Sequence, residues 1–420
     1  MNGYSAALEY LYGLEKFGIL FGLNNIHWIL SLIENPHHLL KTIHVGGTNG
    51  KGSVTRMISA VLQKAGYRVG RYTSPHMVSF TERIAVNDVE ITQEEIVHLT
   101  EFIREKTSIA DPSRTFTFFD FTTALAFEYF RRTQVDIAVI EVGLGGRLDS
   151  TNVIRPLVSV ITNVELDHMD YLGESIHDIA REKAGILKDN VPAVTGAEGV
   201  ALEIIRKTAA GKTSLLVLDE DFSFRKTGDQ AMSYQGVKRS FADLGVSLPG
   251  DHQLSNCALA LCALELAADR GFPAPEEAVR AALLDISWPG RLEVMRQRPT
   301  VILDAAHNPH GAKALARYLK THYTDQRKIL IFGVMKDKNF ASMLGELAPL
   351  GNEILLTRPQ ISRSADPQDL LPFARHGSII ETVSDALLKA KEIAHDDDVI
   401  VVTGSFYTVG EARNIIEQLF

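Results

Sequence analysis

Hydrophobic and polar positions follow two different periods in the first part of the chain. Thr42–Val45 is short, apolar and β-prone, and the run at 54–65 has apolar residues at i, i+3, i+4, i+7, i+8 and i+11, which is one face of a helix. Gly66 ends this predicted helix. Further apolar runs at 135–142 and 158–163 predict buried strands. This alternation is typical of an α/β protein with a doubly wound, mostly parallel sheet.

The same alternation starts again after the turn Ser287-Trp-Pro-Gly-Arg291, whose proline and glycine indicate a domain boundary. Strands are expected at 300–303, 328–334, 353–357 and 399–403, and helices near 311–320, near 384–394 and from 411 onward. About 120 residues are enough for a second α/β domain. We therefore predict one domain over residues 1–296 and a smaller one over residues 297–420.

The composition narrows the class of protein. Hydrophobic residues make up 45% of the chain and charged residues 23%, which are ordinary globular values. The net charge of −9 lacks the basic surplus of nucleic-acid-binding proteins, so we expect no nucleic-acid partner. The two cysteines fall in one alanine- and leucine-rich helical pattern, which fits a reducing compartment. The apolar runs are far shorter than the roughly 20 residues that span a bilayer, and no signal-peptide pattern is present, so we expect a cytoplasmic protein without a membrane partner.

A glycine-rich loop joins the first predicted strand to the first periodic helix. Its sequence, Val45-Gly-Gly-Thr-Asn-Gly-Lys-Gly-Ser53, has the strand and helix context of a phosphate-binding loop. Glycines permit close approach to a phosphate, the helix N-terminus offers N–H groups, Lys51 neutralises charge and the Ser53 hydroxyl can reach Mg²⁺. Gly52 separates the lysine from the hydroxyl, which departs from the common form. The alternative is a glycine-rich turn without a ligand.

Other polar residues follow predicted strands of the first domain, at the sheet edge where parallel sheets bind ligands. They are Ser74, His76, Glu141 and His168. A buried carboxylate at Glu141 needs a partner, and a metal ion is one candidate. An ion pair with Arg147 or Lys51 is the alternative. In the second domain, the strand at 300–303 ends in Asp304-Ala-Ala-His307, again polar groups at a strand tip.

Two apolar segments are open to more than one interpretation. Four phenylalanines surround Asp120 in Phe116-Thr-Phe-Phe-Asp-Phe-Thr-Thr123, and they either stack on an aromatic ligand or belong to the core. The glycine-broken segment Phe17–Leu23 either lines a pocket or packs over the sheet edge.

Ten motifs of this chain stand in the order found in one known family. They are Gly47-Thr-Asn-Gly-Lys-Gly-Ser53, Thr73-Ser-Pro-His76, Phe80-Thr-Glu-Arg-Ile84, Glu141-Val-Gly-Leu-Gly-Gly-Arg-Leu-Asp149, Leu166-Asp-His168, Glu182-Lys-Ala-Gly-Ile186, Pro289-Gly-Arg291, Asp304-Ala-Ala-His-Asn-Pro309, Phe332-Gly-Val-Met-Lys-Asp-Lys338 and Thr403-Gly-Ser-Phe-Tyr407. On these motifs the chain resembles the folylpolyglutamate synthases and dihydrofolate synthases of the Mur ligase superfamily, over nearly its whole length. The position of Gly52 is the form that this family uses.

The resemblance implies both a fold and an activity. It implies an ATP-binding, Mur-ligase-like P-loop domain with the folate site at 1–296, and a smaller Rossmann-like ligase domain at 297–420. The implied activity is the ATP-dependent joining of L-glutamate to a folate or to dihydropteroate through an acyl phosphate, with ATP and Mg²⁺ as cofactors. We expect a monomer whose partners are these small molecules.

The resemblance also implies roles for single residues. The implied nucleotide contacts are Thr48, Asn49, Gly50, Lys51, Gly52, Ser53, Asn256, Arg291 and Asp304. The implied metal ligands are Ser53, Ser74, Glu141 and His168, and the implied catalytic residues are Lys51, Lys183, Asp304 and His307. Lys183 matches a lysine that the family carries as an N-carboxylated side chain; without the resemblance it has the pattern of a surface lysine. The candidate folate contacts are His76, Arg83, Phe119, Asp120 and Thr122, with Asp120 where a glutamate is expected.

Two other functions stay open on the sequence alone. A different ligase of the superfamily, acting on a cell-wall peptide or making poly-γ-glutamate, would share the phosphate and metal motifs. A nucleotide-regulated module would bind ATP without turnover. The segment Phe116–Thr123 and the short N-terminal segment favour folate.

Overall fold

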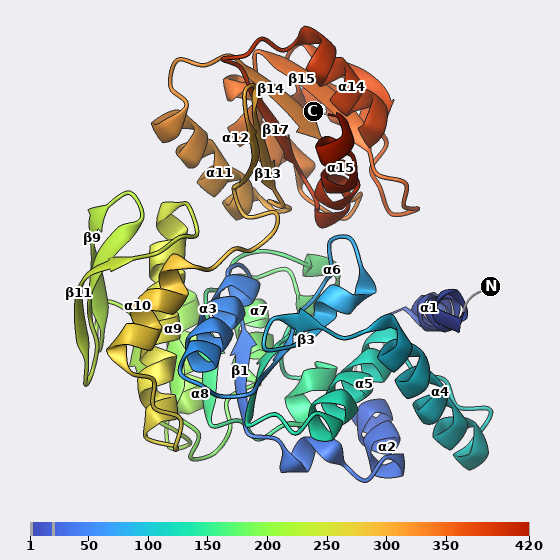
Figure 1. Ribbon diagram of the computed structural model, residues 1–420, viewed down its shortest axis with the longest axis vertical. Coiled ribbons are helices and arrows are strands. Elements are labelled where there is room, and N and C mark those ends of the chain that lie inside the picture. The colour runs from blue at the N-terminus through green and yellow to red at the C-terminus, as the bar shows by residue number, and fades with distance from the viewer. Residues whose placement is uncertain (1–2, 19–21, 420) are drawn as a thin grey trace. The chain divides into compact units, whose positions relative to one another are not determined.

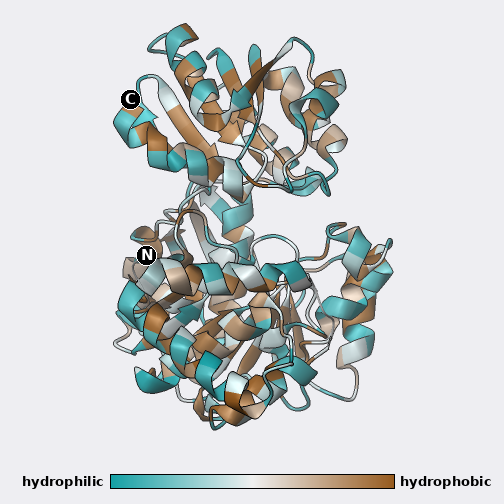
Figure 2. Cartoon of the chain, turned by 90° about the vertical axis from the view of Figure 1, so that its right-hand side faces the viewer, coloured by the Kyte–Doolittle hydropathy of each residue, from teal (hydrophilic) through white to brown (hydrophobic). Residues whose placement is uncertain are grey.

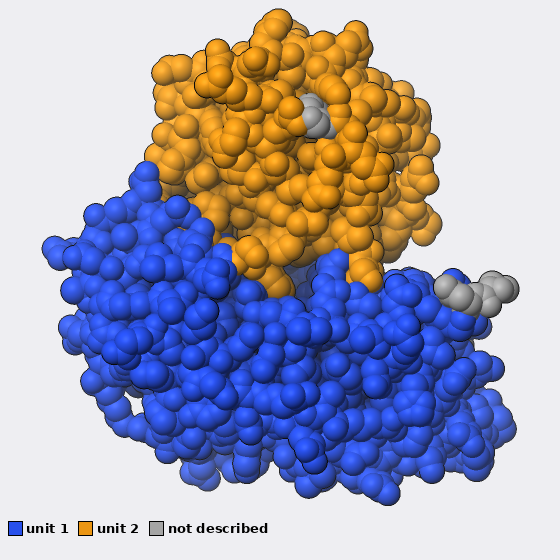
Figure 3. All heavy atoms as spheres, in the orientation of Figure 1, with its two compact units in different colours: residues 1–75, 80–247, 253–286 blue, residues 76–79, 248–252, 287–420 orange. Residues whose placement is uncertain are grey.

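The chain divides into two units in the computed structural model, which describes residues 3–18 and 22–419 (Figure 1). Unit 1 runs to Pro75 and also comprises 80–247 and 253–286, whereas unit 2 comprises 76–79, 248–252 and the chain from Ser287 onward (Figure 3). Each unit has its own sheet. The expectation for the segment Phe17–Leu23 falls largely on residues 19–21, which lie outside the described residues.

Unit 1 is built on an eight-stranded sheet with the order β4-β3-β2-β5-β1-β6-β7-β8. The strands are β1 (Thr42–Gly46), β2 (Val69–Tyr72), β3 (Ile84–Val86), β4 (Val89–Glu90), β5 (Ile137–Glu141), β6 (Val158–Ile161), β7 (Ala193–Thr195) and β8 (Leu215–Val217). Only the pairs formed by β3 are antiparallel. The central strands β1, β5 and β6 are buried at every position, which explains their continuous apolar runs. The predicted mostly parallel sheet is confirmed.

Helices cover this sheet. They are α1 (Gly3–Gly13), α2 (Asn24–Leu32), α3 (Lys51–Lys64), α4 (Gln93–Ala110), α5 (Phe118–Arg132), α6 (Met169–Leu172), α7 (Ile176–Ala184), α8 (Gly199–Ala209), α9 (Asp251–Ala268) and α10 (Glu276–Leu284). Short 3₁₀ turns lie at Leu14–Phe17, Pro36–Leu39, Phe80–Arg83 and Ser150–Val153. Helices α4 and α5 lie side by side (Figure 1), and their apolar faces form one core with α2, β2 and β3.

A three-stranded antiparallel sheet of unit 1 has no counterpart in the sequence prediction. It consists of β9 (Ser223–Gly228), β10 (Ala231–Gln235) and β11 (Ser240–Gly245). The Tyr234 hydroxyl donates a 2.9 Å hydrogen bond to Glu265 of α9, which ties the small sheet to that helix. Its outer residues are polar, so the apolar pattern is weak.

Unit 2 contains a six-stranded sheet with the order β12-β13-β17-β14-β15-β16, in which only β12 runs antiparallel to its neighbour. The strands are β12 (Glu293–Gln297), β13 (Thr300–Asp304), β14 (Lys328–Phe332), β15 (Glu353–Arg358), β16 (Gly377–Thr382) and β17 (Val399–Thr403). The helices are α11 (Pro309–His322), α12 (Phe340–Leu347), α13 (Pro367–Leu370), α14 (Val383–Ile393) and α15 (Phe406–Leu419), with 3₁₀ turns at Ala348–Leu350 and Leu371–Phe373. Two apolar clusters cover the two faces, one with α11 and α12 and the other with α14 and α15. Figure 2 shows the hydrophobic residues concentrated on the strands.

Several boundaries of domains and helices differ between the sequence prediction and the structure. The domain boundary expected between 296 and 297 moves to Ser287, because β12 pairs with β13 inside unit 2. Helix α5 begins at Phe118, inside the aromatic segment, because Thr117 and Asp120 form a capping box at its start. The last helix begins at Phe406 rather than at 411.

Candidate active site

The glycine-rich loop connects β1 to α3, as the sequence predicts. Gly47 has a φ of 140° and Gly50 a φ of 84°, which are conformations that favour glycine. A Cβ on Gly47 would overlap the Thr162 hydroxyl, and one on Gly50 would overlap the side-chain amide of Asn256. At both positions, therefore, a larger residue is disfavoured by the lack of space for a side chain as well as by the backbone conformation. The loop leads into the first turn of α3, whose N–H groups have no partner within a helix and suit an anion.

Polar groups after β6 hold this loop in place. The backbone N–H of Thr48 donates to the carbonyl of Asn163 at 3.0 Å, and the N–H of Asn49 donates to the Asn163 side chain at 2.9 Å. The Thr162 hydroxyl donates to the Asn49 carbonyl at 2.6 Å. Sequence reasoning missed Thr162 and Asn163, although their position just past a buried strand was a usable signal. The loop is preorganised by these contacts.

Asn256 comes to the same loop from α9. Its side chain is 6% exposed, lies against Gly50 and donates to Gln253 at 3.0 Å. The predicted nucleotide contact is thus adjacent to the phosphate loop, although it is 200 residues away in sequence.

Two lysines meet at the loop. The Lys51 ammonium donates to the Thr48 carbonyl at 3.0 Å, and the Lys183 ammonium, on α7, donates to the Gly47 carbonyl at 2.8 Å. Lys183 is 4% exposed, so the interpretation as a surface lysine is wrong. Burial, with the nearby charge of Lys51, lowers the pKa of Lys183 to about 7. Near neutral pH a large share of this amine is therefore neutral.

Two of the predicted metal ligands meet at neighbouring strand ends. Glu141 ends β5 and is 4% exposed, and its Oε2 accepts the N–H of Ser74, which follows β2, at 3.1 Å. Arg147 pairs instead with Glu182 at 2.8 Å, so the ion pair of Glu141 with Arg147 is not formed. A nearly buried carboxylate beside a hydroxyl residue is an oxygen-rich environment that fits a hard divalent cation.

The other two predicted ligands also lie at ends of elements. Ser53 is 2% exposed in the first turn of α3. His168 has a φ of 53°, directly before α6, and its N–H donates to Asp167 at 2.9 Å. Among residues 3–18 and 22–419, no three His, Cys, Asp or Glu side chains gather as a metal cluster. The four predicted metal ligands comprise one carboxylate, one histidine and two serine hydroxyls.

The aromatic segment proves to be mostly core. Phe116, Phe118 and Phe121 are buried, whereas Phe119 is half-buried and lies against Gly143. The phenylalanines are therefore mainly packing residues, and of these four only Phe119 is partly exposed.

Asp120 has a structural position. Its side chain accepts hydrogen bonds from Thr117, at the start of α5, and from the Ser150 hydroxyl at 2.7 Å. It is only 2% exposed, and each carboxylate oxygen is occupied within the protein. The expectation that Asp120 contacts the folate is therefore corrected to a helix-capping role.

Among the remaining candidate folate contacts, Thr122 lies beside Phe119, because its hydroxyl is 3.4 Å from the Phe119 carbonyl. Thr122 is fully buried, with its hydroxyl 3.3 Å from that of Tyr72. Arg83 is 7% exposed, and its guanidinium lies 5.1 Å from the ring of Phe118. His76 belongs to the short segment 76–79 of unit 2.

Unit 2 gathers its own group at the ends of its strands. Asp304 ends β13, and its oxygens accept the N–H groups of Leu292 and Ala306, each at 3.0 Å. Burial raises the pKa of this carboxyl to about 6, although the positive charge of Arg291 opposes the shift.

Phe406 is a member of this group that the sequence analysis did not single out. Its ring lies 4.8 Å from the Arg291 guanidinium and 5.4 Å from the ring of His307. His307 Nδ1 is 3.0 Å from the Ala305 carbonyl. The motif that contains Phe406 was the available signal. Arg291, Asp304 and His307 thus lie in one part of unit 2.

Comparisons with known proteins agree with this arrangement. Residues 45–264 match the Mur ligase middle domain, and residues 290–406 match the Mur ligase, glutamate ligase domain. A dihydrofolate synthase/folylpolyglutamate synthase of Bacillus subtilis is 35% identical over 98% of this chain and 99% of its own length.

Two solved structures share the fold. E. coli FolC in complex with DHPP and ADP has a TM-score of 0.91 at 31% identity and covers 99% of this chain and 98% of its own. A bifunctional folylpolyglutamate synthase/dihydrofolate synthase with Mn, AMPPNP and L-glutamate bound has a TM-score of 0.90 at 31% identity, with 99% and 98% covered.

The fold and the phosphate loop, together with the two domain matches, define a Mur ligase. Within that class, the near full-length relatives show that the chain belongs to the folylpolyglutamate synthase/dihydrofolate synthase family. Within the described residues, every helix is too short or too polar to cross a membrane.

Proposed function

We infer that this protein is an ATP-dependent ligase that joins L-glutamate to the carboxyl group of folates and of dihydropteroate. The observation that carries this inference is the full-length match to dihydrofolate synthase/folylpolyglutamate synthases, with an intact phosphate loop.

The chemistry explains the site. A carboxylate is a poor acceptor for an amine, because its leaving group would be oxide. Its oxygen therefore attacks the γ-phosphorus of ATP, which gives an acyl phosphate and releases ADP. The glutamate amine then attacks the carbonyl carbon, loses a proton and expels phosphate. Each step brings anions together, so the protein must supply positive charge.

The phosphate loop supplies part of that charge. We assign Thr48 to Ser53 and Asn256 to the nucleotide, with Lys51 at the β- and γ-phosphates. Support comes from the packing of Asn256 against Gly50 and from the N–H groups at the start of α3.

We propose that Ser53, Ser74, Glu141 and His168 hold a Mg²⁺ ion. The relative with Mn and AMPPNP bound supports a divalent cation in this family. When bound, such an ion supplies charge that offsets phosphate repulsion. The nearly buried Glu141, with Ser74 beside it, is the part of this chain that fits the ion best.

We also propose that Lys183 is N-carboxylated in the working enzyme. A neutral amine adds to the carbon of CO₂, forms a C–N bond and loses one proton, which leaves an anionic carbamate. The lowered pKa of Lys183 supports this step, because the neutral amine is the reactive form. The hydrogen bond from Lys183 to the Gly47 carbonyl supports a role for this side chain beside the phosphate loop.

Unit 2 contributes Arg291, Asp304 and His307 in our assignment. We place Arg291 and Asp304 at the nucleotide and His307 among the catalytic residues. Their packing around one aromatic ring, that of Phe406, supports a common role for Arg291 and His307.

For the folate we retain His76, Arg83, Phe119 and Thr122 and omit Asp120. Phe119 is the strongest of these, because it is partly exposed, whereas Arg83 and Thr122 are buried. We propose that the enzyme acts as a monomer.

The test is release of ADP by the purified protein with ATP, Mg²⁺ and L-glutamate. We expect release that depends on dihydropteroate or tetrahydrofolate, with a glutamylated product identified by mass. A binding module would release no ADP. A cell-wall ligase would ignore both folates, and either result would contradict the proposal.

A further inference from the structure

Arg291 lies in a turn whose backbone is left-handed on both sides of the arginine. Gly290 has a φ of 67° and Leu292 a φ of 49°. For a leucine this conformation is strained, and it persists only where surrounding contacts enforce it. Leu292 is 2% exposed and belongs to an apolar core of unit 2. The turn that carries Arg291 is therefore imposed by other parts of the unit.

Two carboxylates accept the backbone N–H groups that flank the arginine. The N–H of Leu292 donates to Asp304 at 3.0 Å, and the N–H of Gly290 donates to Glu293 Oε2 at 2.8 Å. Asp304 is assigned to the nucleotide in the proposed function, whereas Glu293 has no role there. Glu293 thus fixes one side of the turn without belonging to the assigned site.

Helix α15 holds the carboxylate of Glu293. Arg413 Nη2 donates to Glu293 Oε1 at 2.9 Å, and Arg413 Nε donates to Glu293 Oε2 at 3.4 Å. Pairing at two points fixes the orientation of a carboxylate as well as its distance. The side chains are only partly exposed, at 31% for Arg413 and 20% for Glu293. The oxygen that accepts the Gly290 N–H is thereby held in place.

The same face of α15 supports the arginine itself. Phe406 and Arg413 are seven positions apart, which is about two helical turns, so both side chains lie on one face of the helix. The Phe406 ring lies 4.8 Å from the Arg291 guanidinium. Between them on the helix, Val409 is fully buried, and its Cγ1 would lie 3.4 Å from a Cβ on Gly290. One helix face therefore contacts both the side chain and the backbone of this turn.

We propose that Glu293 and Arg413 are positioning residues for Arg291. They fix the backbone before the arginine, and so the direction in which its guanidinium meets a nucleotide. Neither residue touches the nucleotide, since each acts through the turn. The proposal rests on the proposed function, which places Arg291 at the nucleotide. Without the pair, Arg291 stays in the chain, but its turn loses one of the contacts that enforce the strained conformation.

The first experiment is calorimetric titration of the whole protein with ADP in the presence of Mg²⁺. Arg291→Met should weaken binding at least about tenfold, because a charged contact is lost. Arg413→Met should weaken it at least about fivefold, because the guanidinium of Arg291 is no longer held in one direction. Arg413→Lys keeps a cation beside Glu293 and should bind within about twofold of wild type. Wild-type affinity of either Arg291→Met or Arg413→Met overturns the proposal.

The double variant distinguishes positioning from a general effect on the fold. If Arg413 acts through Arg291, Arg413→Met should weaken ADP binding no further in a protein that already carries Arg291→Met. An ion pair that only stabilises unit 2 would lower the affinity by the same factor in both backgrounds, and that result overturns the proposal. Urea unfolding of each variant shows that the protein titrated is folded.

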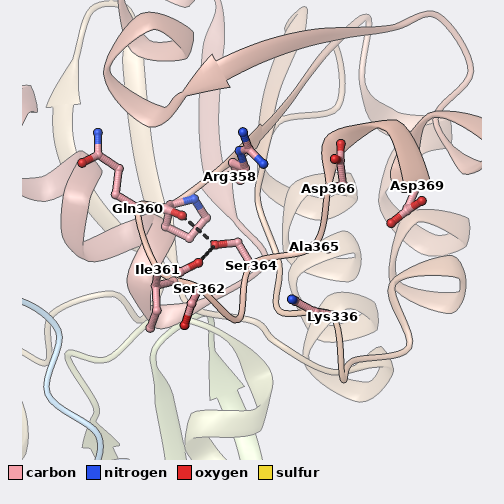
Figure 4. A pocket seen from close by; sticks show the side chains of 10 residues that line it. Lys336, Arg358, Gln360, Ile361, Ser362, Ser364, Ala365, Asp366 and Asp369 are labelled. Atoms are coloured by element: carbon pink, nitrogen blue, oxygen red, sulfur yellow. Dashed lines mark hydrogen bonds between the residues drawn. The ribbon is translucent and has the colours of Figure 1, made fainter. Parts of the chain in front are cut away.

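A control removes another arginine–glutamate pair of unit 2. Arg358 bonds to Glu381 at 3.0 Å and lines a polar pocket of about 400 Å³ (Figure 4). Neither Arg291 nor Arg413 lines this pocket. Arg358→Met should therefore bind ADP as wild type does. If it binds ADP as weakly as Arg413→Met, loss of any such pair has the same effect and the proposal is overturned.

Ligation kinetics separate this proposal from the proposed function. Arg413→Met should raise KM for ATP about fivefold and leave KM for glutamate within about twofold of wild type. If no folate is glutamylated while the ADP titrations behave as expected, the proposed function fails and the positioning role stands. If ligation proceeds and Arg413→Met has the wild-type KM for ATP, the positioning role fails alone.

Discussion

The Lys183 ammonium donates a 2.8 Å hydrogen bond to the carbonyl of Gly47, from a side chain that is 4% exposed. This contact joins α7 to the phosphate loop across 136 positions of sequence. Burying a charged amine is costly, so its proton is held weakly and the pKa falls to about 7. Near neutral pH, Lys183 can therefore take up or release a proton, which a solvent-exposed lysine does only at much higher pH.

A first prediction concerns stability and pH. Between pH 7 and the ordinary lysine value of 10.5, the unfolded chain holds a proton on Lys183 that the folded chain has lost. Stability of the wild type, relative to Lys183→Met, should therefore rise with pH across this window, by up to about 1.4 kcal/mol per pH unit. Urea unfolding of both proteins in CO₂-free buffer at several pH values measures the difference. A difference that stays constant from pH 7 to 10.5 would show that the amine is not perturbed.

A second prediction concerns the carbamate. With ¹³C-bicarbonate, Mg²⁺ and a non-hydrolysable ATP analogue, carbon NMR should show a carbamate signal that is absent from Lys183→Ala. That variant should fold and lack activity, and acetate or formate should restore part of it by supplying a carboxylate in the vacated space. Active wild-type enzyme with no such signal would contradict the proposal.

Much of the fold was predictable, because long apolar runs separated by turn residues leave few arrangements. The strand–loop–helix around Lys51 and the parallel sheet followed from the periodicity alone. The sheet β9–β11 was not predicted, because its strands are largely exposed and only β10 alternates regularly between buried and more exposed positions. The turn Ser287–Arg291, which the sequence indicates as a boundary, is where unit 2 resumes, and β12 belongs to that unit because it pairs with β13.

The site was predictable where it depends on strand ends, and less so where it depends on burial. Glu141 and Ser74 lie on adjacent strands, so their meeting followed from the sheet order. Burial of Lys183 could not be read from the charged helix that carries it. Asp120 was a candidate folate contact through the family resemblance alone, and the spacing from Thr117 to Asp120 is also that of a capping box.

The third prediction tests the glycine at the start of α3. Gly50→Ala should lower both stability and nucleotide affinity, because the new Cβ overlaps Asn256. Gly66→Ala is the matched control: its φ of 99° is also positive, but no atom lies within 4 Å of the added Cβ. In the control, the free energy of unfolding should fall only by the conformational cost of about 1 kcal/mol, and KM for ATP should not change. Equal effects of the two substitutions on KM for ATP would show that the overlap with Asn256 does not cause the loss of nucleotide affinity.

The fourth prediction concerns the divalent cation. Glu141→Gln and His168→Ala should each raise the Mg²⁺ concentration that gives half-maximal activity, because each removes a proposed ligand. Glu101→Gln, an exposed change on α4, is the control and should leave the midpoint unchanged. Activity measured against Mg²⁺ concentration, with ATP corrected for chelation, gives the midpoints. If Glu141→Gln has the wild-type midpoint and only reduced thermal stability, Glu141 has a structural role instead.

The last prediction concerns Lys51, whose ammonium lies over the loop and bonds to the Thr48 carbonyl at 3.0 Å. Lys51→Ala should fold normally, since the side chain is only half-buried, and should lose about 2 to 4 kcal/mol of transition-state stabilisation, or roughly two to three decades in kcat. Lys64→Ala removes an equal charge from the other end of α3, where Lys64 pairs with Asp285 on the surface at 3.7 Å, and should stay near the wild-type rate. The comparison separates a local effect on phosphate from a change in the charge of the helix. Turnover of Lys51→Ala within about threefold of wild type would mean that the lysine does not neutralise the transferred phosphate.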